Sequence, residues 1–224
     1  MMNKKTDYHF ETRAIHEGLK DTPWEGSTLP PIFQSAGHFH ENAESLSRTF
    51  AGESQDHIYM RLTNPTSRWL EQKIAGLESG AGALLTSSGM AAINNACMAL
   101  LRSGDEFVAS RSLFMSSYTL FTNIFKKYGI KVKLADPLNL NEIKENISDK
   151  TRFIYMETVT NPGMEVPDIR QIADLAHENG LPLMIDNTLA SPWLCRPIEL
   201  GADIVLHSTT KYLSGHGGAL GGII

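Results

Sequence analysis

The chain has 224 residues, of which 42% are hydrophobic and 20% are charged, and its formal net charge is -5 at pH 7. This composition is typical of a soluble globular protein, and the acidic balance without a basic cluster argues against nucleic acid as a main partner. The most apolar window, residues 82–101, is interrupted by threonine, serine and asparagine, so we expect no membrane span. Cys97 and Cys195 lie too far apart to indicate a disulfide framework or a zinc site. Since the N-terminus also lacks an apolar signal core, we expect a cytoplasmic protein.

The first 62 residues show no sustained periodicity, and their scattered prolines and glycines predict an irregular arm. A regular helix is predicted after Asn64, which suits an N-cap, followed by Pro65 at the first helical position. Gly80 is the expected end of this helix. One helical face is predicted to carry Leu70, Ile74 and Leu77.

Short apolar runs then alternate with helical segments. Strands are predicted at 82–86, 106–110, 131–135, 152–157, 181–186 and 203–208, and helices at 90–101, 118–129, 139–147 and 168–180. This alternation predicts right-handed βαβ units and an α/β fold with a mainly parallel sheet. The last segment, 217–224, begins another apolar strand, so we expect the chain to be the front part of a longer protein.

Polar residues follow three of the predicted strands, where ligands gather in parallel sheets. The stretch "TSSGM" at 86–90 suits an anion bound at a helix N-terminus, although a plain N-cap explains it equally well. Asp186 ends an apolar strand, and it either faces a cation or caps its own turn. Lys211 stands among hydroxyls and glycines in "HSTTKYLSGHGG", where we expect a desolvated amine. An anion cradle, a buried acid and an amine together suit pyridoxal 5′-phosphate.

The sequence resembles the Cys/Met-metabolism family of pyridoxal-phosphate enzymes. The motifs that carry the resemblance are "YMRLTNPT" (59–66), "SSGMAAI" (87–93), "ETVTNPGMEVPDI" (157–169), "IDNTLASPWLCRPIELGAD" (185–203) and "DIVLHSTTKYLSGHG" (203–217). The resemblance covers nearly all of the chain from about residue 12. It implies the large domain of the aspartate-aminotransferase-like fold (fold type I), truncated before a C-terminal small domain, with residues 1–62 as an arm that contacts a neighbouring subunit and 63–224 as the cofactor-binding domain.

The resemblance also implies roles for single residues. Lys211 would be the Schiff-base lysine and the base that moves the Cα proton, and Asp186 would pair with the pyridine nitrogen. The phosphate would be bound at Ser88, Gly89 and Met90 and by the hydroxyls of Ser208 and Thr210, and it would be reached by Tyr59 and Arg61 of a neighbouring subunit. Asn161 would lie beside the 3′ oxygen. No metal site is expected, because the histidines of the arm lack further ligands at metal spacing.

One position departs from the family pattern. The residue that stacks on the cofactor ring is usually a tyrosine, and here it is Phe114, with Tyr118 four residues later. Stacking survives this change, whereas the phenolic hydroxyl implicated in handling the γ leaving group is lost.

The implied function is γ-replacement on an activated homoserine ester, as in the O-acetyl- and O-succinylhomoserine sulfhydrylases. The implied assembly is a homo-oligomer with shared active sites, a dimer or a dimer of dimers. Methionine γ-lyase, cystathionine γ-lyase and cystathionine γ-synthase are alternatives from the same family. A non-catalytic subunit that docks on a full-length partner is an alternative of another class.

Overall fold

Residues 8–18 and 27–224 are described by the computed structural model on which the following account rests. The chain forms two units, Met1–Leu77 and Glu78–Ile224. The division predicted from the sequence, at residues 62 and 63, stays a prediction. Within the described ranges, no helix is both long enough and apolar enough to cross a bilayer.

The N-terminal unit contains α1 (Phe10–His16), α2 (Ala43–Phe50) and all but the last residue of α3 (Pro65–Glu78). The predicted start of α3 is confirmed, because the Asn64 side chain accepts a hydrogen bond from the backbone N–H of Thr66 at 2.9 Å. The expectation of an arm without regular structure was wrong for α1 and α2. The second of these helices begins at an Asn42 side chain that accepts from the Ser45 N–H at 2.8 Å.

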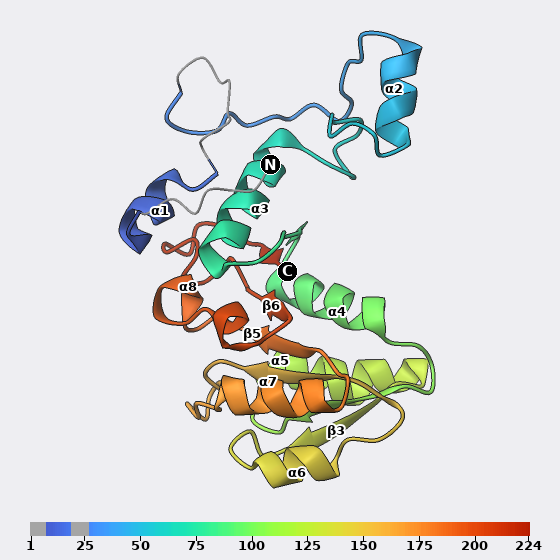
Figure 1. Ribbon diagram of the computed structural model, residues 1–224, viewed down its shortest axis with the longest axis vertical. Coiled ribbons are helices and arrows are strands. Elements are labelled where there is room, and N and C mark those ends of the chain that lie inside the picture. Colours follow the sequence, from blue (N-terminus) through green and yellow to red (C-terminus); the bar gives the residue numbers. More distant parts are fainter. Residues whose placement is uncertain (1–7, 19–26) are drawn as a thin grey trace. The chain divides into compact units, whose positions relative to one another are not determined.

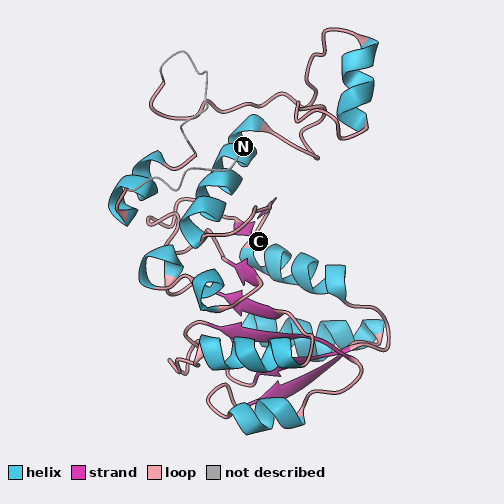
Figure 2. Ribbon diagram, in the orientation of Figure 1, coloured by secondary structure: helices cyan, strands magenta, loops and turns pink. Residues whose placement is uncertain are grey.

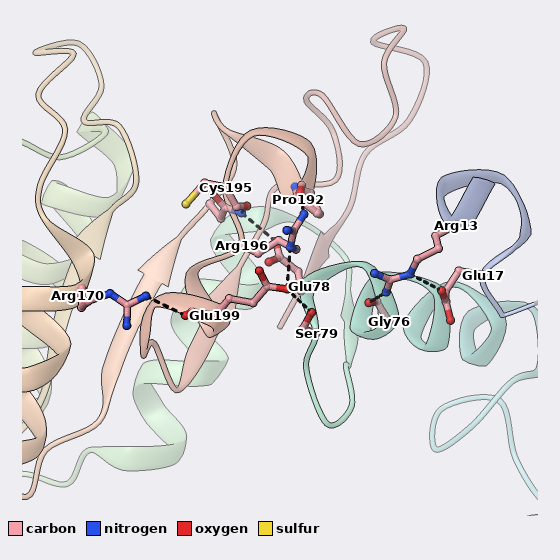
Figure 3. Close-up of polar contacts among 11 residues, drawn as sticks. Arg13, Glu17, Gly76, Glu78, Ser79, Arg170, Pro192, Cys195, Arg196 and Glu199 are labelled. Atoms are coloured by element: carbon pink, nitrogen blue, oxygen red, sulfur yellow. Dashed lines mark hydrogen bonds and ion pairs between the residues drawn. The ribbon is translucent and has the colours of Figure 1, made fainter. Parts of the chain in front are cut away.

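Arg13 anchors α1 within this unit. Its Nε lies 3.0 Å from the Glu17 carboxylate, and the same guanidinium donates to the backbone carbonyl of Gly76 on α3 (Figure 3). A Cβ on Gly76 would meet the Glu17 side chain, which would have to move to make room for it.

The C-terminal unit is built on a five-stranded parallel sheet in the order β3-β2-β4-β5-β6 (Figure 2). The strands are β2 (Glu106–Ser110), β3 (Lys131–Ala135), β4 (Thr151–Glu157), β5 (Leu183–Asp186) and β6 (Ile204–Leu206). Because β3 and β4 lie on opposite sides of β2, the chain reverses direction across the sheet at β2. Ligands bind at such reversals in parallel sheets, outside the carboxyl ends of the strands.

Helices cover both faces of this sheet (Figure 1). One face is packed by α4 (Gly89–Leu100) and by the helical segment that begins with α5 (Met115–Thr119), and the other by α6 (Leu140–Glu145) and α7 (Ile169–Glu178). Alternate residues of a strand enter different cores: Phe107 and Phe153 pack under α4, whereas Val108 and Ile154 pack under α7. The α/β fold with a mainly parallel sheet is therefore confirmed.

The link between β5 and β6 contains α8 (Ser191–Leu194) and a 3-10 helix (Pro197–Leu200). Glu199 connects this link to its surroundings, because its carboxylate accepts from the Ser79 hydroxyl at 2.8 Å and lies 2.9 Å from Arg196 Nε (Figure 3). Arg170 Nη2 of α7 reaches the Glu199 carbonyl at 3.4 Å.

Two predicted elements differ in detail from the structure. The run 82–86 supplies only β1 (Leu85–Thr86), which pairs antiparallel with β7 (Gly222–Ile223) instead of joining the parallel sheet. The helix predicted over 118–129 is a succession of α5, a π-helix (Leu120–Ile124) and a 3-10 helix (Phe125–Tyr128). Gly129 ends it in the left-handed conformation at φ 73°.

Candidate active site

A cavity of about 640 Å³ opens at the carboxyl ends of β2, β4, β5 and β6 and at the N-terminus of α4. All of its lining residues belong to the C-terminal unit. Those predicted from the sequence are Ser88, Gly89, Met90, Phe114, Asn161, Asp186, Ser208, Thr210 and Lys211. The remaining lining residues are Ile93, Glu157, Val159, Thr188, Leu189, Tyr212, Gly215, Gly217 and Leu220. The structure thus brings together nine predicted site residues, whose roles stay predictions.

The N-terminus of α4 forms one wall of the cavity. Ser88 is its N-cap, since the hydroxyl oxygen accepts from the Ala91 N–H at 3.1 Å, so the plain capping interpretation of "TSSGM" holds as well. Gly89 is required by close packing, because a Cβ there would lie 2.6 Å from the Cβ of Ser208. The first turn of α4 therefore packs directly against the segment after β6. The N-terminus of a helix favours a bound anion, so this place suits a phosphate.

Asp186, the last residue of β5, is partly buried at the cavity wall. Its Oδ1 accepts from the Thr188 N–H at 3.0 Å, and the Tyr155 hydroxyl donates to its Oδ2 at 3.4 Å. Burial raises the pKa of Asp186 above its ordinary value even though the contacts with Thr188 oppose this. The carboxyl group therefore caps its own turn, and it also lines the cavity as a group that would gain from a cationic partner.

The segment after β6 carries the lysine. Ser208 is fixed by its N–H, which donates to the Thr188 hydroxyl at 2.8 Å. The Thr210 hydroxyl both accepts from the Gly221 N–H at 3.1 Å and donates to the Gly221 carbonyl at 3.3 Å. Lys211 is exposed in a run of turns whose residues are themselves mostly exposed, so the expectation of a desolvated amine stays a prediction.

Phe114 and Asn161 stand on loops after β2 and β4. Phe114 is 43% exposed and lines the cavity, where a flat ligand ring could stack on its side chain. Tyr118, the nearest phenol along the chain, lies on α5 and is not among the cavity residues. Tyr118 therefore does not replace, within the cavity, the hydroxyl group that Phe114 lacks.

Buried polar residues behind the cavity were missed by sequence reasoning. Glu78 accepts from His207 at 2.6 Å and from the Asn187 side chain at 2.9 Å, and all three are buried. Asn187 follows Asp186 and His207 precedes Ser208, so this network fixes the backbone next to two predicted site residues. The only signal in the sequence was that polar residues adjoin an apolar strand, which does not reveal a partner 129 positions away.

Tyr59 and Arg61 belong to the N-terminal unit, which is described by itself. Both are exposed, and the Arg61 guanidinium carbon lies 5.7 Å from the centre of the Tyr59 ring. The turn between them is closed by the Leu62 N–H, which donates to the Tyr59 carbonyl at 2.8 Å. A cation held near an aromatic ring suits the recognition of a phosphate, and the role of the pair across a subunit boundary stays a prediction.

Comparisons with known proteins give a consistent assignment. The profile of the family described as "Cys/Met metabolism PLP-dependent enzyme" matches residues 11–224. An L-methionine gamma-lyase of Porphyromonas gingivalis is 41% identical over 216 residues, 96% of this chain and 54% of the relative. An O-acetyl-L-homoserine sulfhydrylase of Leptospira meyeri is 41% identical over 214 residues, 96% of this chain and 48% of the relative. The chain thus spans about half the length of these curated relatives.

Solved structures agree with this assignment. A Campylobacter jejuni protein assigned as an O-acetylhomoserine (thiol)-lyase, crystallised with N′-pyridoxyl-lysine-5′-monophosphate, superposes with a TM-score of 0.93 at 34% identity. That match covers 97% of this chain and 54% of the other. A cystathionine gamma-lyase of Lactobacillus plantarum gives a TM-score of 0.88 at 35% identity, over 96% of this chain and 54% of the other. The chain therefore belongs to the Cys/Met metabolism family of PLP-dependent enzymes.

Proposed function

We propose that the whole protein uses pyridoxal 5′-phosphate to carry out γ-replacement on an activated homoserine ester. The observation that carries the proposal is the convergence of Lys211, Asp186 and the N-terminus of α4 on one cavity. These groups come from three separate segments of the chain, and they match an aldehyde, a basic ring nitrogen and a phosphate. Names of similar proteins, among them an O-acetyl-L-homoserine sulfhydrylase, support the reaction class.

The cavity residues fit this cofactor. The close contact of Gly89 with Ser208 leaves the first N–H groups of α4, a helix of 12 residues, beside the cavity as a site for phosphate. Asp186 would ionise opposite a protonated ring nitrogen, and its pairing would reverse the rise in its pKa that burial causes. When bound, the cofactor supplies an electron sink for negative charge at the substrate Cα. Phe114 would stack on one face of the cofactor ring.

Lys211 Nζ is the amine that would accept the Cα proton, since among the described residues it is the one lysine lining the cavity. An exposed, fully hydrated lysine is poorly placed to act as a base, so the Nζ would have to be shielded from water and held near the substrate. A partner that covers the turns at 209–218 would shield the amine from water and could place a cationic side chain near it. We propose that a second copy of the chain supplies both, through Tyr59 and Arg61, in a homo-oligomer with shared active sites.

The residue at position 114 favours a carboxylate leaving group. Phe114 has no proton to give, and a carboxylate departs without one because the pKa of its acid is only about 4. A thiolate leaves less readily without a proton, since even a cysteine thiol, with a pKa of about 8.5, is a much weaker acid than a carboxyl group. An acylated homoserine therefore suits this cavity better than methionine or cystathionine does.

Methionine γ-elimination is a second candidate, because several similar proteins are named L-methionine gamma-lyase. Steady-state assays of the full-length protein would compare O-acetylhomoserine plus sulfide with methionine alone. We expect the ester to be the better substrate, and Phe114→Tyr to raise methionine elimination several-fold while replacement on the ester changes little. A wild-type enzyme that prefers methionine would favour the second candidate.

Absorbance tests the cofactor assignment on the full-length protein. We expect a yellow band that borohydride removes, together with a pyridoxyl group on the peptide containing Lys211. A colourless protein that does not respond to added pyridoxal phosphate would support the non-catalytic subunit instead.

We also propose a cytoplasmic location, since Cys97 and Cys195 are both free thiols, as is usual in a reducing compartment.

A further inference from the structure

Glu157 is a buried carboxyl group of the cavity to which neither the motif pattern nor the proposed reaction gives a role. It is the last residue of β4, in register with Asp186, the last residue of β5. Two acidic side chains therefore end neighbouring parallel strands, and both line the same cavity. Glu157 is only 5% exposed.

The two oxygens of Glu157 accept hydrogen bonds from two different loops. Oε1 accepts from the backbone N–H of Phe114 at 2.8 Å, and Oε2 accepts from the backbone N–H of Asn161 at 3.0 Å. The first loop follows β2 and the second follows β4. One carboxyl group thus connects the residue predicted to stack on the cofactor ring with the residue predicted to lie beside its 3′ oxygen.

The setting of Glu157 differs from that of an ordinary structural carboxylate. In the described part of the chain, no lysine, arginine or histidine lies within ion-pair distance of Glu157. By contrast, Glu106, the first residue of β2, pairs with Lys133 at 2.8 Å. Burying a carboxyl group without a cation is costly, and the two N–H groups only partly offset the cost. Burial raises the pKa of Glu157 to about 7, and the nearby Asp186 adds to this rise. A glutamate kept in so unfavourable a place points to a role in the cavity.

We propose that Glu157 is a positioning residue that locks Phe114 and Asn161 into one arrangement for binding the cofactor. The inference rests on the proposed function, because Phe114 and Asn161 would act by contacting the ring of the bound cofactor. The side chain acts through its two acceptor oxygens. A glutamine at this position would retain one acceptor and turn an amide donor toward the other N–H, so one of the two loops would be released.

The first test uses the cofactor-free, full-length protein. Amide hydrogen exchange would be followed in peptides that cover residues 111–116 and 158–163, for the wild type, Glu157→Gln and the control Glu106→Gln. We expect exchange in at least one of these loops to rise tenfold or more in Glu157→Gln and to stay at the wild-type rate in Glu106→Gln. Unchanged exchange in both loops of Glu157→Gln would overturn the proposal.

The second test measures pyridoxal phosphate binding and the induced circular dichroism of the bound cofactor. We expect Glu157→Gln to weaken binding about tenfold and to reduce the dichroism per bound cofactor, because the ring would be held less firmly. Glu106→Gln is expected to leave both unchanged. If Glu157→Gln does not fold, Glu157→Asp carries the same test, since the shorter side chain cannot reach both loops. Wild-type affinity and dichroism in the folded variant would contradict the proposal.

A double-mutant cycle separates positioning from general destabilisation. If Glu157 acts through the loops, combining Glu157→Gln with Phe114→Ala or with Asn161→Ala should weaken cofactor binding by less than the product of the single effects. Strict additivity in both cycles would mean that Glu157 supports the fold alone. A wild-type protein that binds no pyridoxal phosphate would instead refute the proposed function, so the two failures are distinguishable.

Discussion

The two ends of the parallel sheet treat acidic side chains in opposite ways. At the amino ends of β2 and β4, Asp105 accepts from the Arg102 N–H and pairs with Arg152, and these contacts lower its pKa. Glu106 pairs with Lys133, and this contact is the main cause that lowers the pKa of Glu106. At the carboxyl ends of β4 and β5, burial raises the pKa of Glu157 and of Asp186, and neither faces a lysine or arginine in the described chain. The acids at the amino end are thus paired with basic side chains, whereas Glu157 and Asp186 have no lysine or arginine partner among the described residues.

Removing the lysine of the carboxyl end should have the largest effect. We expect Lys211→Ala in the full-length protein to lower turnover by at least about a thousandfold and to abolish covalent attachment of the cofactor, because no other lysine lines the described cavity. Lys133→Ala at the amino end serves as the control and should keep both. Far-ultraviolet dichroism would verify the fold. Normal turnover in folded Lys211→Ala would refute the assigned role.

Replacing one acid at each end of the sheet by its amide should affect turnover at one end and the stability of the fold at the other. We expect Asp186→Asn to lower turnover about a hundredfold, because the ring nitrogen loses its anionic partner. The cofactor-free form of this variant should be as stable as the wild type or more stable, since a carboxyl group with a raised pKa is removed. Asp105→Asn should lower the melting temperature with turnover intact. Chemical denaturation and steady-state kinetics measure the two effects, and the same pattern in both variants would remove the contrast between the ends.

The proposed sharing of the active site between subunits can be tested by mixing two inactive variants. We expect Arg61→Ala and Lys211→Ala subunits to be inactive separately and to regain up to about a quarter of wild-type activity after mixing, since random pairing in a two-fold dimer makes that share of intact sites. Subunit exchange would be verified by mass spectrometry. No recovery after complete exchange would place the site within a single chain.

The smallest expected effect is a pH dependence of stability. Because the pKa of Glu157 is raised to about 7, the folded protein binds this proton more tightly than the unfolded chain does. The stabilisation is therefore complete below about pH 4.5 and is lost as the pH rises through about 7, by at most about 3 kcal/mol. Urea denaturation of the cofactor-free protein should show the wild type losing stability relative to Glu157→Gln across this range. A pH-independent difference would mean that Glu157 is ionised throughout.

Much of the sheet was predictable because local patterns determine it. The apolar runs 106–110 and 131–135 became β2 and β3 with the same bounds, and Asn64 and Ser88 start their helices as hydrogen-bonding N-caps. The rule that polar residues after parallel strands meet at one edge also brought Asp186 and Lys211 to the same cavity. Periodicity, capping and strand direction are short-range properties that a single sequence carries.

Other features were decided by contacts between distant segments. The antiparallel pairing of β1 with β7 joins residues more than 130 positions apart, and the hydrogen bonds of Glu78 to His207 and of Glu157 to Phe114 are equally invisible in either local sequence. The exposure of Lys211 likewise depends on what packs over its turns.

By itself, the sequence determined the α/β class, most strand positions, the family and the identity of the candidate cofactor residues. Only the tertiary structure decided which acids are paired and which are left without a cation, because burial and charge pairing arise between elements and not within them.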